Sequence, residues 1–249
     1  MGLRTKLFVV GSAVWLMLAI GITGAQALAQ SGQTTQSPVQ DAMSGDPWEM
    51  GALVQGGFGL TEDRNDFKFI MAGGHLGKVL TDPHLPGHLR GQFEYAVEAF
   101  PFWQSYTPTF QRAHCVAAQA PLISCTGLYS TGGTYTGASI TPIILRWNFV
   151  SGRKLMPWAQ GAGGVLWTNH KYPGFGQGTI SLANDGPATD ASVFNFTPQF
   201  GVGFHYFVRP KRSIDFSANA IHISSASLGD RNPGVNASVQ FSLGYTWWK

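Results

Sequence analysis

The sequence is poor in charged residues. Asp, Glu, Lys and Arg together make up 12% of its 249 residues, about half of the roughly 25% that is usual in soluble domains. The formal net charge is only +3, which excludes the basic footprint of a nucleic-acid-binding protein. A disordered chain is excluded because it needs low hydrophobicity and high net charge, and a helical bundle because it is rich in Ala, Glu, Lys and Leu.

Cysteine is almost absent, with two residues, Cys115 and Cys125. No Cys-x-x-Cys or His-x-x-His pair accompanies them, so the sequence predicts no metal site. Ten positions separate the two cysteines, and exported proteins hold disulfides. We therefore expect a local disulfide that pins a loop.

Long apolar runs are missing beyond the N-terminus, which excludes a membrane-spanning helix in the remainder. Residues 1–29 have the pattern of a secretory signal peptide, with a basic start (Arg4, Lys6), an apolar stretch, and small residues before a cut near Ala29. Removal of this segment takes two of 16 basic residues and leaves 14 against 13 acidic ones. Residues 30–45 are expected to be a flexible leader, and 46–249 a single β domain.

Glycine and aromatic residues are abundant instead, with 32 Gly and 13% Phe, Trp and Tyr, while the mean hydropathy is +0.00. Apolar and small polar residues alternate over ten or more positions, which is typical of membrane β-strands. In the last strand, for example, Phe241, Leu243, Tyr245 and Trp247 share one face. Eight strands are predicted, near 47–60, 67–80, 91–104, 137–150, 155–168, 192–208, 213–226 and 236–248.

The lengths of the connections alternate. Short links follow the fourth and sixth predicted strands, and long loops, 105–136 and 169–191, follow the third and fifth. This is the pattern of an eight-stranded antiparallel up-and-down transmembrane β-barrel, with the long loops outside the cell. The rival interpretation is a soluble ligand-binding barrel of the lipocalin type, which has the same alternation with the faces exchanged. The low charge and the aromatic strand ends favour the membrane barrel.

Charged residues also fall on the polar faces of two neighbouring strands. Glu94 and Glu98 lie on the third predicted strand and Arg146 on the fourth. They are expected to pair inside the lumen as structural filling.

The seventh predicted strand breaks its own pattern. Its apolar face runs through Phe216 and Ala220, and the next two positions in that phase are His222 and Ser224. The two lie about 7 Å apart along an extended strand. A His that accepts the Ser proton raises its nucleophilicity, which is the core of serine hydrolysis. The alternative is a polar decoration of the membrane interface.

The stretch HISSASLGDRNPGVN, residues 222–236, resembles the signature of the lipid A 3-O-deacylase (PagL) family. Members of that family are eight-stranded outer-membrane barrels with a His-x-Ser pair near the end of the seventh strand and an Asn in the following loop. The resemblance implies ester hydrolysis of a hydroxyacyl chain of lipopolysaccharide, without cofactor. It assigns Ser224 as nucleophile, His222 as general base and Asn232 to the oxyanion hole.

The sequence departs from the family at two positions. The third member of the family's triad is a Glu, and the matching position here is Asn236, which can hold the His by a hydrogen bond but brings no charge. Strict alternation also turns Asn236 toward the polar face, away from His222; Asp230 is the nearest carboxylate in sequence. The second departure is Ser225, where the family often has Asn.

Two functions therefore remain open for a protein of the bacterial outer membrane. The first is a lipid A esterase that acts on lipopolysaccharide of the outer leaflet, as a monomer or a homodimer. The second is a non-catalytic barrel that is structural, adhesive through the loops 105–136 and 169–191, or binds lipopolysaccharide. Neither needs a nucleic-acid partner.

Overall fold

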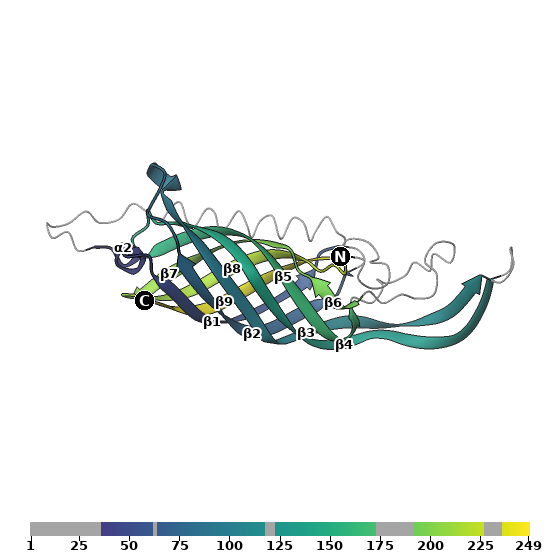
Figure 1. The fold of residues 1–249 in the computed structure, drawn as a ribbon. Coiled ribbons are helices and arrows are strands. Elements are labelled where there is room, and N and C mark those ends of the chain that lie inside the picture. The colour runs from purple at the N-terminus through teal and green to yellow at the C-terminus, as the bar shows by residue number, and fades with distance from the viewer. Residues whose placement is uncertain (1–35, 62–63, 118–122, 173–191, 227–235) are drawn as a thin grey trace.

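The chain folds into a closed antiparallel β-barrel (Figure 1). The structure is a computed structural model that describes residues 36–61, 64–117, 123–172, 192–226 and 236–249, with side chains for all of these except 110–129 and 131. The elements are α2 (Pro38–Met43), β1 (Trp48–Gly59), β2 (Lys68–Val79), η2 (Gly87–Leu89), β3 (Gly91–Ala117), β4 (Ile123–Phe149), β5 (Leu155–Tyr172), β6 (Ser192–Phe196), β7 (Gln199–Arg209), β8 (Arg212–His222) and β9 (Ala237–Trp248).

Neighbouring strands pair in the order β4-β3-β2-β1-β9-β8-β7-β5-β6, and an additional β4–β5 pairing closes the sheet. β6 and β7 are one strand that Thr197 and Pro198 interrupt. The register runs unbroken across the interruption, since Gln199 lies opposite Ile221 and Phe196 opposite Ser224. Proline has no N–H to donate to a ladder. The barrel therefore has eight strands, and the predicted fold class is confirmed.

The connection between the third and fourth predicted strands differs from the expected loop. Residues 105–136 largely continue β3 and β4 as a two-stranded ribbon, in register from Ser105 opposite Tyr135 to Ala117 opposite Ile123. Figure 1 shows this ribbon projecting past the end of the barrel. The prediction of a long loop was wrong because most of this segment pairs as two strands, and Gly132 and Gly133 take positive φ values of 92° and 96° inside the ribbon.

Cys115 and Cys125 are opposite each other in the backbone register of this ribbon. Their side chains lie outside the described part of the chain, and so does the part of the other predicted loop from 173 to 191. The disulfide between the two cysteines stays a prediction.

A short helix fills the rim of the barrel that carries the short turns. α2 begins at Ser37, whose hydroxyl accepts from the Gln40 amide while the Gln40 side chain accepts from the Ser37 amide, a capping box. Its buried face packs against residues from the ends of four strands and the β4–β5 turn, and the whole cluster comprises Val39, Ala42, Met43, Val79, Val150, Met156, Phe207 and Trp248. This part of the chain is thus helical, whereas the sequence suggested a flexible leader.

The opposite half of the lumen is filled by a second apolar cluster. It comprises Leu53, Phe67, Phe69, Met71, Phe100, Trp103, Tyr135, Leu166, Tyr172, Ile221 and Ile223. Tyr172 lies at its centre, with ring centroids of Trp103 and Tyr135 at 5.4 Å and 4.9 Å. Aromatic pairs at these distances and angles add to the stabilisation from burial. Two of its members, Ile221 and Ile223, lie at the C-terminal end of β8 and just beyond it.

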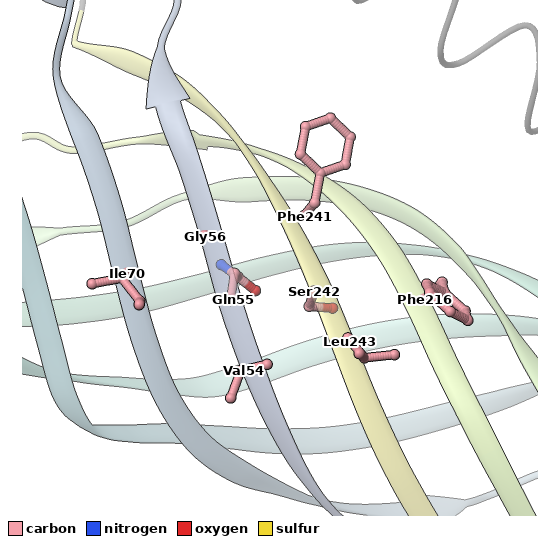
Figure 2. A pocket seen from close by; sticks show the side chains of 8 residues that line it. All are labelled: Val54, Gln55, Gly56, Ile70, Phe216, Phe241, Ser242 and Leu243. Atoms are coloured by element: carbon pink, nitrogen blue, oxygen red, sulfur yellow. The ribbon is translucent and has the colours of Figure 1, made fainter.

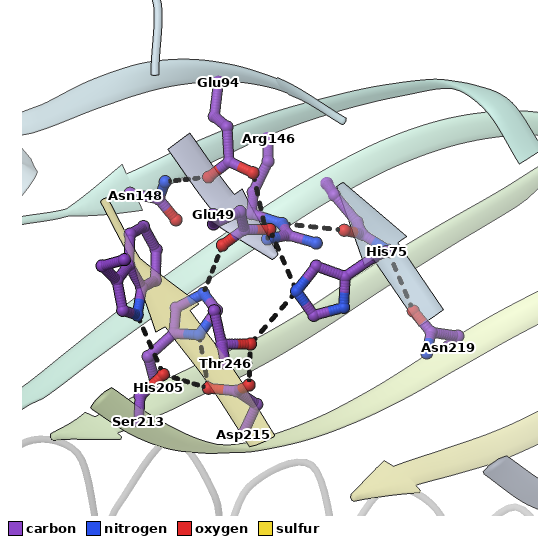
Figure 3. A network of polar contacts seen from close by, with 12 residues as sticks. Glu49, His75, Glu94, Arg146, Asn148, His205, Ser213, Asp215, Asn219 and Thr246 are labelled. Carbon is purple, nitrogen blue, oxygen red and sulfur yellow. Dashed lines mark hydrogen bonds and ion pairs between the residues drawn. The ribbon is translucent and has the colours of Figure 1, made fainter. Parts of the chain in front are cut away.

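Between the two apolar clusters lies a layer of buried charge (Figure 3). Arg146 donates to Glu49 at 2.6 Å and to Glu94 at 3.2 Å, and its guanidinium lies 4.7 Å from the ring centroid of Trp158. The predicted pairing of Arg146 with Glu94 is confirmed. Glu98 is also buried, but no direct ion pair joins it to Arg146 within the described residues. Glu49, which contacts Arg146 across the lumen, was missed.

A second part of the same layer is built around Asp215. Its carboxylate accepts from Ser213 at 2.7 Å, from Thr246, and contacts His205 Nδ1 at 2.6 Å. The other ring nitrogen of His205 lies 3.9 Å from Glu49, so this imidazole stands between two carboxylates. The hydrogen bonds satisfy most of the buried charges, as burial in a low-dielectric interior requires.

Candidate functional site

The site predicted from the sequence lies at the far end of β8, on the outer surface of the barrel. Along this strand Asp215, Asn219 and Ile221 are buried in the lumen, whereas Phe216 is 39% exposed on the outside. His222 and Ser224 continue the outward phase and are half-exposed, with Ile223 buried between them. The predicted lipid-facing phase of the His-Ser pair is confirmed.

The backbone that carries the pair is held on both sides. His222 N–H donates to the Pro198 carbonyl at 3.0 Å, and Ser224 and Phe196 exchange two hydrogen bonds of 2.9 Å and 2.6 Å. On the other side Ile223 N–H donates to the Asn236 carbonyl at 3.0 Å. The segment beyond the formal end of β8 is therefore still part of the sheet, and the two side chains project from a rigid support.

The imidazole of His222 is oriented by a main-chain group. Its Nδ1 lies 3.0 Å from the carbonyl oxygen of Asn236. A carbonyl only accepts hydrogen bonds, so Nδ1 carries the proton and Nε2 of the neutral ring keeps its lone pair. The resemblance to the family suggested the Asn236 side chain for this role, whereas strict alternation turned that side chain away from His222. That side chain is instead buried, 1% exposed, and its Nδ2 has no hydrogen-bond partner among the described residues.

The hydroxyl of Ser224 also has a backbone donor. The amide of Ala226 donates to Ser224 Oγ at 3.2 Å, and Ala226 takes a positive φ of 47°. Such left-handed backbone is uncommon outside glycine and favours a tight turn after the serine. Asn232 and Asp230, which the sequence placed in the following loop, lie outside the described residues.

The inner face behind the pair carries the apolar side chains of Ile221 and Ile223, beside the buried polar side chains of Ser225 and Asn236. Ile221 is 7% exposed and Ile223 2% exposed, and both belong to the aromatic-rich cluster around Tyr172. The inward face of β8 thus changes from polar at Asp215 to apolar at the level of the His-Ser pair. This packing limits the motion of the backbone from which His222 and Ser224 project.

The outer surface has a hollow of about 360 Å³ on the same side of the barrel (Figure 2). Its lining comprises Val54, Gln55, Gly56, Ile70, Phe216, Phe241, Ser242 and Leu243. Gly56 lies between Phe241 of β9 and Ile70 of β2 and contributes no side chain. The space therefore exists because two large apolar side chains flank a glycine.

Small side chains separate this hollow from the His-Ser pair. Phe241 lies opposite Ala218 on β8, and the next pairs in the same phase along the two strands are Ala220 with Val239, which is 7% exposed, and His222 with Ala237. An apolar path with few protruding groups therefore runs along the seam of β8 and β9. The sequence carried no signal for the hollow, because it depends on which strands become neighbours.

Two absences hold among the described residues. No helix among them is long and apolar enough to cross a membrane. No group of three or more His, Cys, Asp or Glu side chains among them is arranged to hold a metal ion.

The fold defines a class: an eight-stranded outer-membrane barrel, here with a His-Ser pair on the outward face of β8 and the residues that follow it. Residues 88–246 match the family model described as lipid A 3-O-deacylase (PagL). This match spans more than half of the chain, and the protein belongs to the PagL family. It is therefore a bacterial outer-membrane protein of the lipid A deacylase type, a family of hydrolases.

Solved structures with a similar course of the chain are also outer-membrane barrels. The outer membrane enzyme PagL is 14% identical, covers 80% of this chain and 98% of its own, and has a TM-score of 0.40. The N-terminal barrel domain of Pseudomonas aeruginosa OprF is 11% identical over 81% and 98%, with a TM-score of 0.35. OprG from the same organism is 8% identical over 82% and 96%, with a TM-score of 0.44. Comparison with curated proteins gives no match.

Proposed function

We propose that the protein removes an ester-linked hydroxyacyl chain from lipid A, with Ser224 as nucleophile and His222 as general base. The observation that carries the proposal is the hydrogen bond from His222 Nδ1 to the Asn236 carbonyl. This bond leaves Nε2 as the basic nitrogen, on the same outward face as a serine two residues further along. A nucleophile, a base and a group that orients the base are the three parts of a hydrolytic triad.

The proposed reaction has two steps. Ser224 Oγ attacks the ester carbonyl of the acyl chain while its proton passes to His222 Nε2, and that proton then goes to the sugar oxygen as it leaves. Water next attacks the acyl-serine, with His222 again taking a proton, and the free hydroxy acid departs. Asn232 is proposed to donate to the developing oxyanion, a role worth about 3 kcal/mol in other hydrolases.

A carbonyl in place of a carboxylate changes what the third group does. In a serine protease, replacing the Asp by Asn lowers kcat about 10⁴-fold, because the His then adopts the wrong tautomer. The Asn236 carbonyl fixes the productive tautomer, since it only accepts a hydrogen bond. What it lacks is a full negative charge to stabilise the imidazolium. We therefore expect an active enzyme that is slower than one with a carboxylate.

The hollow beside Gly56 is the proposed binding place for the acyl chain. Ser224 lies six positions beyond Ala218, the partner of Phe241, or about 20 Å along the strand. With the roughly 40° tilt of strands in such barrels, this is a depth of about 15 Å, half of the roughly 30 Å hydrocarbon core. A chain whose ester lies at Ser224 would then reach the hollow with its far end.

Mass spectrometry of lipid A from cells that express the protein tests the function. The wild-type chain should produce lipid A that lacks one hydroxyacyl group, and Ser224→Ala should not. Ser225→Ala is the matched control, because the neighbouring serine is buried and faces the lumen. Heat-modified mobility on gels checks that all three are folded. Unchanged lipid A in cells with folded wild-type protein would overturn the proposal.

The second candidate is a barrel that binds lipopolysaccharide or a surface partner without cleaving it. The ribbon of β3 and β4, which projects beyond the barrel, is the observation that favours it (Figure 1). In that case Ser224→Ala and the wild type would bind lipopolysaccharide equally and leave its acyl pattern alike. A homodimer belongs to the same set of proposals, and cross-linking in the membrane would detect it.

Two features of maturation complete the proposal. We propose that the signal peptide is removed near Ala29 and that Cys115 and Cys125, which are opposite in the register, form a disulfide. Mass spectrometry of the purified protein tests both. The expected chain begins near residue 30, and its peptide with both cysteines gains two hydrogens only after reduction.

A further inference from the structure

The barrel rim that carries the short turns is strongly basic. The cations at this rim are Lys78, Arg90, Arg153, Lys154, Arg209, Lys211, Arg212 and Lys249, and all are exposed except the half-buried Lys78 and Arg212. The accessible acids there are Asp41, Asp46 and Asp82. At the opposite rim the exposed cations among the described side chains are Lys68 and Lys171. The exposed positive charge of the described residues is thus concentrated at the rim that carries the short turns.

Aromatic side chains lie on the outer surface next to this basic rim. Trp48 is 50% exposed, Trp247 39% and Tyr206 44%. Two cations are direct strand neighbours of the tryptophans: Lys78 is opposite Trp48, with its Nζ 5.3 Å from the ring centroid, and Arg212 is opposite Trp247. Trp and Tyr in such belts lie at the level of lipid headgroups. The cations are therefore placed at the level of the lipid phosphates.

The cations are spread around the circumference. They come from the end of β2, the link before β3, the β4–β5 turn, the β7–β8 turn and the residue after β9. A single macromolecular partner would need them on one side, whereas a ring of lipids contacts every side. For Lys154, Arg209 and Lys211 no carboxylate lies within ion-pair distance in the described part of the chain, so their charges are available to a ligand.

We propose that this basic rim binds the anionic headgroups of glycerophospholipids in the periplasmic leaflet of the outer membrane. The short turns place the rim on the periplasmic side. Anionic lipid attracts cations near the surface by about 1 kcal/mol for each Lys or Arg, and salt screens the attraction. The binding anchors the barrel at a fixed depth and is independent of any chemistry at Ser224.

Unfolding in vesicles tests the proposal. The full chain is folded into vesicles of phosphatidylcholine alone or with phosphatidylglycerol, and the rate of unfolding in urea is followed by tryptophan fluorescence. The rim variant is Arg90→Gln, Lys154→Gln, Arg209→Gln and Lys249→Gln, one cation from each of four places. The control variant is Lys68→Gln with Lys171→Gln at the opposite rim.

Phosphatidylglycerol is expected to slow unfolding of the wild type and of the control about tenfold or more, and of the rim variant less than threefold. High salt should remove the effect from the wild type, a result that needs no variant to fold. Equal unfolding rates of the wild type in both kinds of vesicle would overturn the proposal. So would an effect of phosphatidylglycerol that is as large in the rim variant, or one that disappears in the control variant.

Discussion

The substitution Asn236→Ala tests how His222 is oriented. In the structure His222 Nδ1 donates to the main-chain carbonyl of residue 236 over 3.0 Å, and alanine keeps this acceptor. If the side chain held the ring, the variant would no longer keep the imidazole in the productive tautomer. The value of kcat would then fall by about 10⁴-fold, as for the triad Asp of serine proteases. If the carbonyl holds the ring, kcat should fall less than about fivefold, because a shift in a preserved hydrogen bond is worth at most about 1 kcal/mol.

The two outcomes differ by about three orders of magnitude. The assay is the release of hydroxy acid from lipid A in detergent, with kcat and KM determined separately. Asn236→Glu is the companion variant: its carboxylate would enter the lumen beside Ile223, so it should destabilise the barrel and give no gain in rate. A loss of more than a hundredfold in Asn236→Ala, with the barrel still folded by heat-modified mobility, would refute the reasoning.

Three further predictions concern stability and specificity. Arg146→Gln leaves Glu49 and Glu94 without their cation and should lower the free energy of unfolding by about 3–5 kcal/mol; a urea titration that finds less than about 1 kcal/mol would contradict the role of the charged layer. Met43→Ala should cost about 2 kcal/mol in the same titration, because the side chain is buried under the rim, and no change would mean that α2 does not pack there. Gly56→Leu should fill the hollow and raise KM for substrates with long acyl chains, while kcat for short chains stays constant. If the variant and the wild type have the same KM for long-chain substrates, the hollow does not bind the acyl chain.

Most of the barrel was predictable because alternation is a local property. The outward positions of β8 could be read from Ile214 to Ser224 by counting in twos, and the structure places them outside as predicted. The pairing of Glu94 with Arg146 followed from adjacent strands. Glu49 reaches the same Arg146 across the lumen, and such a contact depends on the tilt and closure of the whole barrel.

The details of the candidate site were less accessible for a different reason. The alternation correctly turned the Asn236 side chain away from His222, and this made position 236 look unsuited to the role. A sequence differs from position to position only in its side chains. The hydrogen bond to His222 is made by a main-chain carbonyl, which every residue type possesses, so the residue type at 236 does not reveal it. α2 was missed because six residues are too few for a periodic pattern, although Ser37 and Gln40 form its capping box.

The layered interior has a consequence for transport. Ions that enter from the periplasm meet the apolar cluster under α2, and solutes from outside meet the aromatic cluster around Tyr172. The charged groups around Arg146 lie between the two clusters, so the described side chains fill the lumen in three successive layers. A solute in the lumen would have to pass two apolar layers and one charged layer, whereas the outward His222 and Ser224 can be reached without entering the lumen.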